Sequence, residues 1–240
     1  MVRYSRRRFC PAWGGGTWST DYDSFWCCQG TGVETNTKLM DSIYAYDSSS
    51  VYVNLFTPSK LNWSQRGVTI TQTTTFPVGD TTTLTVGGSG NWAMNIRIPS
   101  WTSNATISIN DQQQSVATTP GSYATISRTW KSGDTVTVKL PMHLRLVIAN
   151  DDKSVAAVAY GPTVLAGNYG SSSPNGTPTL TLSSLKRKST SSLDFTATAN
   201  GAAVTLSPFY DAQGYNYVVY WSVSGSLPIS KEALIYSGVS

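Results

Sequence analysis

The chain has 240 residues, with 17 lysines and arginines against 13 aspartates and glutamates, which gives a formal net charge of +4. Four arginines near the amino terminus, Arg3, Arg6, Arg7 and Arg8, account for that excess, so the remainder is neutral and offers no basic groove for nucleic acid. No stretch approaches the ~20 apolar residues that cross a bilayer as a helix. We therefore expect neither nucleic-acid nor membrane partners.

The first 25 residues lack hydrophobic periodicity, and two adjacent cysteines, Cys27 and Cys28, follow them. Neighbouring cysteines rarely bond to each other because the ring is strained, so each sulfur is expected to find a metal, a substrate or a distant cysteine. A thiolate pair suits Zn²⁺, and an electropositive setting makes a cysteine nucleophilic. The alternative is that the pair packs as small hydrophobes beside Phe25 and Trp26.

The segment from Gly30 to Tyr46 has helical periodicity, because apolar or half-polar positions recur at spacings of four, three and four. Those positions are Val33, Thr37, Met40 and Tyr44. The sequence therefore predicts one helix here, with the two cysteines on the loop before its amino terminus. The helix dipole at that end favours a thiolate.

After Asp47, short alternating runs follow one another about every ten residues and are separated by turn residues such as Gly79-Asp80 and Asn110-Asp111. This spacing is typical of an all-β fold, a β-sandwich of the jelly-roll kind. The expected strands are 51–56, 68–73, 82–86, 92–98, 105–109, 123–127, 135–140 and 144–148.

A second boundary is expected after Gly167, because residues 168–192 are rich in Ser, Pro, Thr and Gly and contain little that could form a core. Strands resume at 195–198, 203–207 and 217–223, as a carboxyl-terminal addition to the sandwich. We thus predict three regions, 1–46, 47–167 and 168–240.

Three glycosylation sequons begin at Asn62, Asn104 and Asn175, and they indicate an extracellular protein, although no signal peptide precedes the charged amino terminus. Eight tryptophans are many for this length. Those within strand patterns, such as Trp92 and Trp221, are expected in the core. Trp13, Trp18 and Trp26 surround the cysteines and are the better candidates for stacking on a sugar ring.

Several motifs resemble, in order and spacing, the β-L-arabinofuranosidase family of glycoside hydrolases, family 127 and its relatives. They cover about residues 13–167 and reappear near the carboxyl end. They include Cys27-Cys28-Gln29-Gly30-Thr31-Gly32-Val33-Glu34, Asn36-Thr37-Lys38, Val51-Tyr52-Val53-Asn54-Leu55-Phe56, Arg97-Ile98-Pro99-Ser100-Trp101, Arg128-Thr129-Trp130, Leu140-Pro141-Met142, Tyr160-Gly161-Pro162 and Pro208-Phe209-Tyr210.

The resemblance implies a zinc-dependent, retaining enzyme that acts on arabinose-containing glycans of the plant cell wall. By resemblance Cys27 is the nucleophile, Cys28 is a zinc ligand, and both sulfurs contact the metal. The remaining ligands and the acid/base glutamate would come from an earlier (α/α)₆ barrel, which the chain lacks, since residues 1–12 with Cys10 do not look like the family. The predicted helix would then be a remnant of that barrel.

The resemblance therefore favours the carboxyl-terminal part of a secreted glycoside hydrolase, inactive by itself because zinc needs four ligands. The alternative is a carbohydrate-binding or structural β-sandwich module without catalysis. An apolar docking surface would favour the first reading, and glycan binding through exposed aromatic side chains would favour the second.

Overall fold

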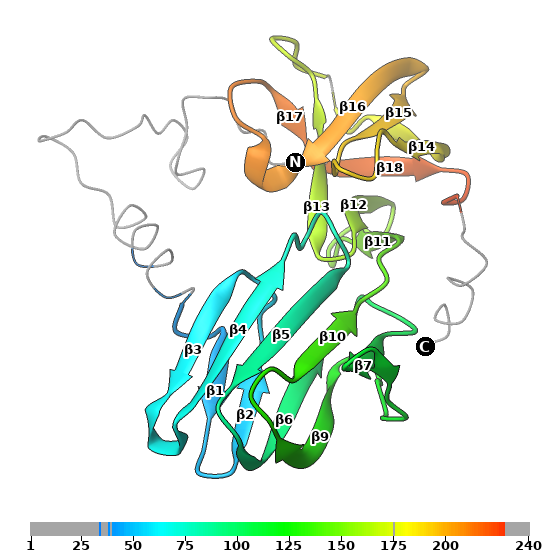
Figure 1. Ribbon diagram of the computed structural model, residues 1–240. Coiled ribbons are helices and arrows are strands. Elements are labelled where there is room, and N and C mark those ends of the chain that lie inside the picture. The colour runs from blue at the N-terminus through cyan, green and yellow to red at the C-terminus, as the bar shows by residue number, and fades with distance from the viewer. Residues whose placement is uncertain (1–33, 35–37, 39, 175, 229–240) are drawn as a thin grey trace, which may run out of the picture. The chain divides into compact units, whose positions relative to one another are not determined.

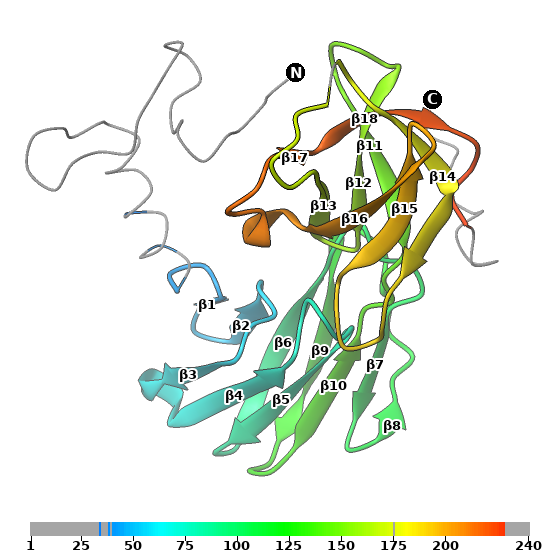
Figure 2. The same cartoon turned by 90° about the horizontal axis from the view of Figure 1, so that it is seen from above.

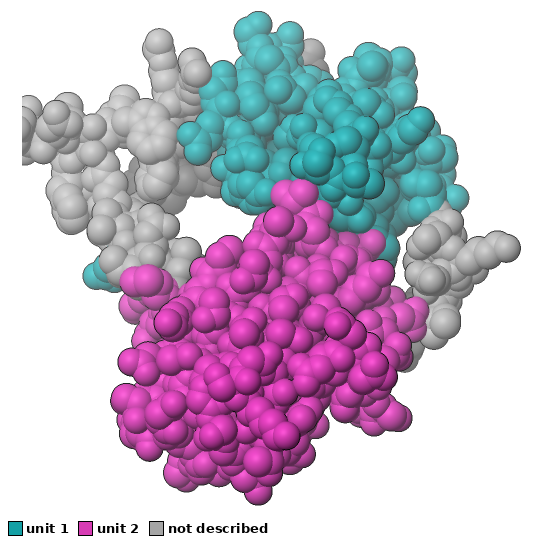
Figure 3. Space-filling model, viewed as in Figure 1, with its two compact units in different colours: residues 1–36, 143–240 teal, residues 37–142 magenta. Residues whose placement is uncertain are grey.

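The structure, a computed structural model, describes residue 34, residue 38 and residues 40–174 and 176–228. The described chain is almost entirely β-structure, arranged in three sheets (Figure 1). It divides into two compact units, coloured in Figure 3: unit 2 comprises Thr37–Met142, and unit 1 comprises His143–Ser240 together with Met1–Asn36. The prediction of an all-β chain is confirmed, while the jelly-roll connectivity stays a prediction.

Unit 2 contains two sheets. The four-stranded sheet has the order β1-β2-β6-β9, in which only the β2–β6 pair is parallel. Its strands are β1 (Tyr44–Tyr46), β2 (Ser50–Val53), β6 (Gly90–Ile98) and β9 (Ser122–Trp130). The six-stranded sheet is antiparallel throughout, in the order β3 (Ser59–Trp63), β4 (Val68–Thr74), β5 (Thr81–Gly87), β10 (Thr135–Lys139), β7 (Thr106–Ile109) and β8 (Gln112–Gln113).

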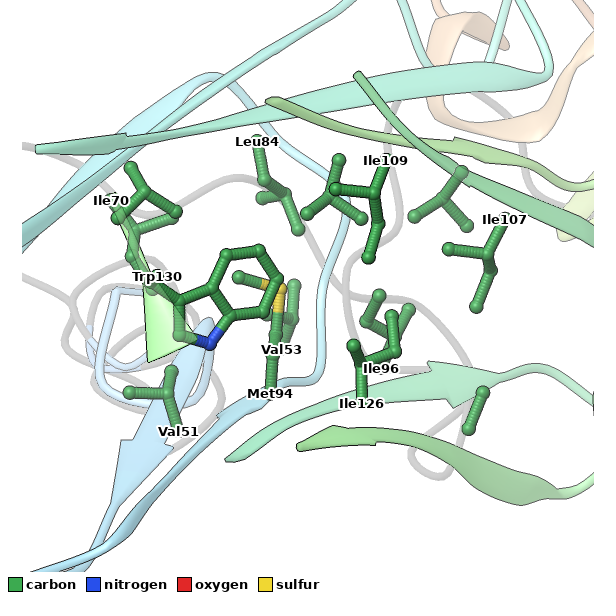
Figure 4. Packing of buried hydrophobic residues seen from close by; sticks show 14 of the residues in the cluster. Val51, Val53, Ile70, Leu84, Met94, Ile96, Ile107, Ile109, Ile126 and Trp130 are labelled. Carbon is green, nitrogen blue, oxygen red and sulfur yellow. The ribbon is translucent and has the colours of Figure 1, made fainter. Parts of the chain in front are cut away.

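The two sheets of unit 2 share one apolar core, because alternate residues of their strands point into it. In Figure 4, Met94, Ile96 and Ile126 from one sheet face Ile70 and Leu84 from the other. Strands 68–74 and 90–98 match the sequence expectation closely, because in both of them buried residues recur at every second position. Because one side of each strand is buried in this shared core, the sequence shows apolar residues at every second position of the strands.

A row of aromatic rings crosses this core. Trp63 packs edge-on against Trp92 at 5.7 Å, and Trp92 stacks on Trp130 at 5.0 Å between ring centroids. The indole Nε1 of Trp130 donates to the Trp92 carbonyl oxygen at 3.0 Å. The expectation that Trp92 belongs to the core is confirmed, because only 3% of its surface is exposed.

The predicted helix does not extend to Tyr46. Its first part lies outside the described residues; Glu34 and Lys38 are helical, but Tyr44–Tyr46 form strand β1. The Asp47 carboxylate accepts hydrogen bonds from the amides of Ser49 at 2.7 Å and Ser50 at 2.8 Å. This Asx turn folds β1 back onto β2, so pairing in the sheet overrides the helical spacing.

Unit 1 contains a sheet that closes on itself. Six strands pair in the ring β12-β18-β14-β15-β16-β13, and β13 pairs again with β12. The ring strands are β12 (Val155–Tyr160), β18 (Tyr220–Ser224), β14 (Thr179–Arg187), β15 (Phe195–Ala199), β16 (Ala202–Pro208) and β13 (Thr163–Asn168). Two further strands, β11 (Leu144–Ile148) and β17 (Tyr217–Val218), pair with β12 and β13.

The interior of this ring corrects the expectation that residues 168–192 lack core. Leu180, Leu182 and Leu185 of β14 are at most 4% exposed and belong to the cluster that surrounds Trp221. The register between β14 and β15 shifts between Thr181 and Lys186, and this irregularity breaks the alternation that sequence reading depends on. The expectation that Trp221 is a core residue is confirmed, since it is fully buried.

The units also divide the chain differently from the predicted regions. Unit 2 ends at Met142, whereas the sequence places a boundary after Gly167, which lies inside β13. Strands β11 to β13 pair with the later strands of unit 1, so the segment 143–167 shares a sheet with the carboxyl-terminal strands.

Gly167 provides a test of packing in unit 1. A Cβ added at this position would overlap Cη2 and Cζ2 of the buried Trp221 ring. Gly167→Ala should therefore destabilise the protein by about 1–3 kcal/mol through overpacking, measured by chemical denaturation. In a Trp221→Phe background, the same change should cost less, because the shorter phenylalanine side chain lacks the Cη2 and Cζ2 atoms that the added Cβ would overlap. Equal costs in both backgrounds would contradict this assignment.

The Asp134 carboxylate joins two turns of unit 2. Its Oδ1 accepts from Asn110 Nδ2 and its Oδ2 accepts from the Lys131 amide, both at 2.9 Å, while Arg128 lies 3.6 Å away. These hydrogen bonds, that of Asn110 first, hold the pKa of Asp134 below its usual value, and Arg128 contributes by its charge.

The lowered pKa of Asp134 predicts a pH dependence. The stabilisation is present above the unfolded-state pKa of about 3.9 and is lost as the pH falls through the lower folded-state value. Asp134→Asn should reduce the free energy of unfolding by about 1 kcal/mol near neutral pH, and this deficit should shrink below about pH 4. Denaturant titrations across that range measure both quantities. A deficit that stayed constant with pH would rule out the titration of Asp134.

Candidate functional surfaces

The predicted catalytic site falls on residues outside the described part of the chain. Cys27 and Cys28 lie there, as do the proposed sugar-stacking residues Trp13, Trp18 and Trp26. Within the described residues, no group of three or more His, Cys, Asp or Glu side chains could hold a metal ion. The two cysteines offer donor atoms that suit zinc, so a four-coordinate site would need two more ligands from elsewhere.

The segment that follows the cysteines is anchored in unit 2 by a buried polar network. The Tyr44 hydroxyl lies 3.0 Å from Ser59 Oγ, and Gln72 Nε2 donates to that hydroxyl at 3.2 Å and to the Leu55 carbonyl at 3.1 Å. Gln72 is only 2% exposed, and Thr82 Oγ1 donates to its Oε1 at 3.1 Å. Burial raises the pKa of Tyr44. The network fixes β1 to the six-stranded sheet.

Two of the three sequons lie on described, exposed backbone. Asn62 is exposed in β3, which is an edge strand, and Asn104 is exposed in the loop before β7 with a φ of 56°. Asn175 lies outside the described residues. An oligosaccharide on either described asparagine would extend into solvent without displacing a core side chain.

The outward side of the four-stranded sheet carries aromatic and hydrogen-bonding side chains on adjacent strands. We call this surface the polar face and define it by Tyr52, Asn54, Asn95, Arg97, Tyr123 and Thr125. Their neighbours in sequence, such as Val53, Ile96 and Ala124, point into the core. Figure 2 shows β2, β6 and β9 side by side, and the register pairs Tyr52 with Asn95 and Arg97 with Tyr123.

Hydrogen bonds hold the polar face in one arrangement. The Tyr123 hydroxyl donates to Asn54 Oδ1 and Arg97 Nε donates to the Asn54 carbonyl oxygen, both at 2.6 Å. The rings of Tyr52 and Tyr123 meet edge to face at 5.6 Å. Thr125 Oγ1 donates to Asn95 Oδ1 at 2.7 Å. The sequence predicts 51–56 and 92–98 as strands, and the Tyr, Asn and Arg at alternating positions of these strands are the signal from which a hydrophilic outer face can be recognised.

A second aromatic surface lies on unit 1, at the short 3₁₀ helix Phe209–Asp211. Phe209 and Tyr210 are 46% and 56% exposed, and the Phe209 ring packs edge-on against Tyr217. The Asn216 side chain donates to the carbonyls of Ser171 and Ser172, both at 3.0 Å, which secures this loop. Partial burial, followed by the charges of Asp211 and Asp194, raises the pKa of Tyr210.

Among the described residues, no helix is both long and apolar enough to span a membrane.

Comparison with known proteins identifies the middle of the chain. Residues 50–142 match the family model described as "Beta-L-arabinofuranosidase, GH127 middle domain", and the match ends where unit 2 ends. No match was found among curated proteins.

Three solved structures share the fold. A GH127 beta-L-arabinofuranosidase from Geobacillus stearothermophilus T6 has a TM-score of 0.70 at 21% identity, covering 82% of this chain and 37% of its own. A protein described as a glycoside hydrolase gives 0.74 at 19%, covering 93% and 45%. A GH127 beta-arabinofuranosidase gives 0.66 at 23%, covering 82% and 38%.

This chain therefore spans less than half the length of each of these three structures. At such identities the structural matches establish the fold, while the family model adds sequence evidence for residues 50–142. The resemblance to the GH127 β-L-arabinofuranosidases is confirmed, and within unit 2 it is carried by residues 50–142, which match the model of the middle domain.

Proposed function

We propose that this chain is the carboxyl-terminal part of a secreted glycoside hydrolase of the β-L-arabinofuranosidase type. The observation that carries the proposal is the match of residues 50–142 to the GH127 middle domain, which lies wholly within unit 2. The glycans it serves are arabinose-containing polymers of the plant cell wall. The other residues of the active site belong to a helical barrel that precedes unit 2 in the complete enzyme.

The chemistry we assign to Cys27 is nucleophilic. Its thiolate attacks the anomeric carbon, the bond from that carbon to the leaving oxygen breaks, and an acid outside this chain protonates that oxygen. Water, deprotonated by the same group, then displaces the sulfur and restores the thiolate, so the two inversions give net retention. Cys28 is assigned as a zinc ligand; a bound zinc ion would keep both sulfurs deprotonated.

The role we assign to unit 2 is to support the part of the chain that carries the nucleophile. Strand β1 is held to the core of unit 2 by the hydrogen bonds among Tyr44, Ser59 and Gln72. This strand follows the cysteines in the sequence. Because β1 is tied to a buried glutamine, the chain has a fixed point at Tyr44. Precise placement of a nucleophile depends on such support.

A chimera tests this function. Replacing the matching segment of the Geobacillus stearothermophilus enzyme by this chain should give a protein that binds zinc and hydrolyses an aryl β-L-arabinofuranoside. Cys27→Ser should lower kcat/KM by about a thousandfold or more while zinc stays bound. Cys28→Ser should lose zinc as well, measured by metal analysis after dialysis.

Cys10→Ser in the same chimera is the matched control and should retain both zinc and activity, because Cys10 has no assigned role. The chain by itself should bind zinc weakly and show no turnover. A folded, zinc-loaded chimera without activity would contradict the proposed function, and identical behaviour of the Cys27 and Cys28 variants would contradict the division of roles.

Secretion predicts glycosylation at the exposed sequons. When the chain is expressed through a yeast secretory pathway, Asn62→Gln and Asn104→Gln should each remove one glycan, seen as a step in mobility that endoglycosidase treatment abolishes. Asn91→Gln is a control, because Asn91 is exposed but does not begin a sequon: the residue two positions later is Ala93. Unmodified Asn62 and Asn104 in the secreted protein would count against the extracellular assignment.

A further inference from the structure

We propose that the polar face of the four-stranded sheet binds an acidic glycan, with Arg97 holding the carboxylate of a uronic acid and the Tyr52–Tyr123 pair contacting sugar rings. The evidence for this proposal lies wholly in described residues of unit 2, so it does not depend on the proposed catalytic function.

The first support is the state of Arg97. Its Nε is engaged with the Asn54 carbonyl oxygen at 2.6 Å, which fixes the guanidinium plane. Its terminal nitrogens make no hydrogen bond or ion pair within the described part of the chain. A fixed guanidinium with free terminal donors matches the two oxygens of a carboxylate.

The second support is the charge of the surface. None of the six residues that define the polar face is acidic, so no side chain among them competes for Arg97. The ion pair of Arg128 with Asp134 shows the contrasting situation, because there the carboxylate is already supplied by the protein. A cationic and otherwise neutral surface favours an anionic ligand over a neutral arabinan.

The third support is the set of aromatic and amide groups around Arg97. Tyr123, 44% exposed, is paired with Arg97 across the strands, and its hydroxyl is fixed by Asn54. Asn95 is 7% exposed and uses its Oδ1 to accept from Thr125, while its Nδ2 has no partner within the described residues. A rigid ring beside fixed donors can contact the apolar side of a sugar and its hydroxyl oxygens together.

The geometry also argues for an extended ligand. Five of the six residues come from three adjacent strands and Asn54 directly follows β2, while neighbouring strands lie about 4.8 Å apart. They therefore span about 10 Å across the strands, which is about two sugar units. The ligand class we infer is a polysaccharide that carries uronic acid residues, such as an acidic pectic chain.

The test is affinity electrophoresis of the full chain in gels that contain polygalacturonate, neutral arabinan or no polysaccharide. The basic amino terminus could itself bind a polyanion, so every comparison is made in an Arg6→Ser/Arg7→Ser/Arg8→Ser background. Polygalacturonate should retard this protein, and neutral arabinan should retard it much less.

Arg97→Gln should weaken polygalacturonate binding by about tenfold, because a charge-assisted hydrogen bond is lost. Tyr123→Ala should weaken binding severalfold. The matched control is Tyr220→Ala, since Tyr220 is also a strand tyrosine with 44% exposure but lies on unit 1. Thermal unfolding of each variant checks that the fold is intact.

Thr125→Glu keeps the test decisive if Arg97→Gln unfolds the protein. Thr125 is an exposed neighbour of Tyr123 on the same face, so a carboxylate there should repel the uronate. Retardation that survives Thr125→Glu and Arg97→Gln, equal retardation by arabinan, or loss of all binding once the terminal arginines are replaced would each overturn the proposal.

Discussion

Everything described in unit 2 depends on strict alternation along the strands of its four-stranded sheet. Val51, Met94 and Ile96 are fully buried because they point toward the six-stranded sheet. Tyr52, Asn95 and Arg97 are directed to the opposite side by the same pleat. A slip of one residue in register would bury Arg97 and expose the core residues. The strand register that packs the core therefore also determines which side chains form the outer surface.

That constraint explains which strands can be predicted from the sequence. In the strands 68–74, 81–87 and 90–98, buried residues recur at every second position, and the predicted strands agree with them to within two residues. The strand β3 was missed, because its run Ser59-Lys60-Leu61-Asn62-Trp63 contains two apolar residues and none is β-branched. Strand β1 is predicted as helix because Tyr44 continues the helical spacing of Val33, Thr37 and Met40, and three residues are too few to show strand alternation.

The strands of unit 1 are harder to predict from the sequence, for a different reason. Its strand β12 has four buried residues in succession, Ala156 to Ala159, so it shows no alternation. Its closing contacts join segments that are distant in sequence, and no local pattern reports them. The candidate cysteines stood out by the chemistry of an adjacent thiol pair, and their separate roles came from the motif resemblance. The outer residues of β6 and β9 could have been assigned to one surface from alternation, but their hydrogen bonds could not.

The position of β18 has a consequence for how the chain acquires its structure during synthesis. This strand pairs with β12 on one side and, in parallel, with β14 on the other. The ring of unit 1 therefore cannot close until residues near 224 have left the ribosome, whereas every strand of unit 2 is complete once Lys139 has emerged. Vectorial folding would give the two units separate histories, and a nascent chain stopped before Tyr220 would leave β12 and β14 with unpaired edges open to chaperones or to other chains.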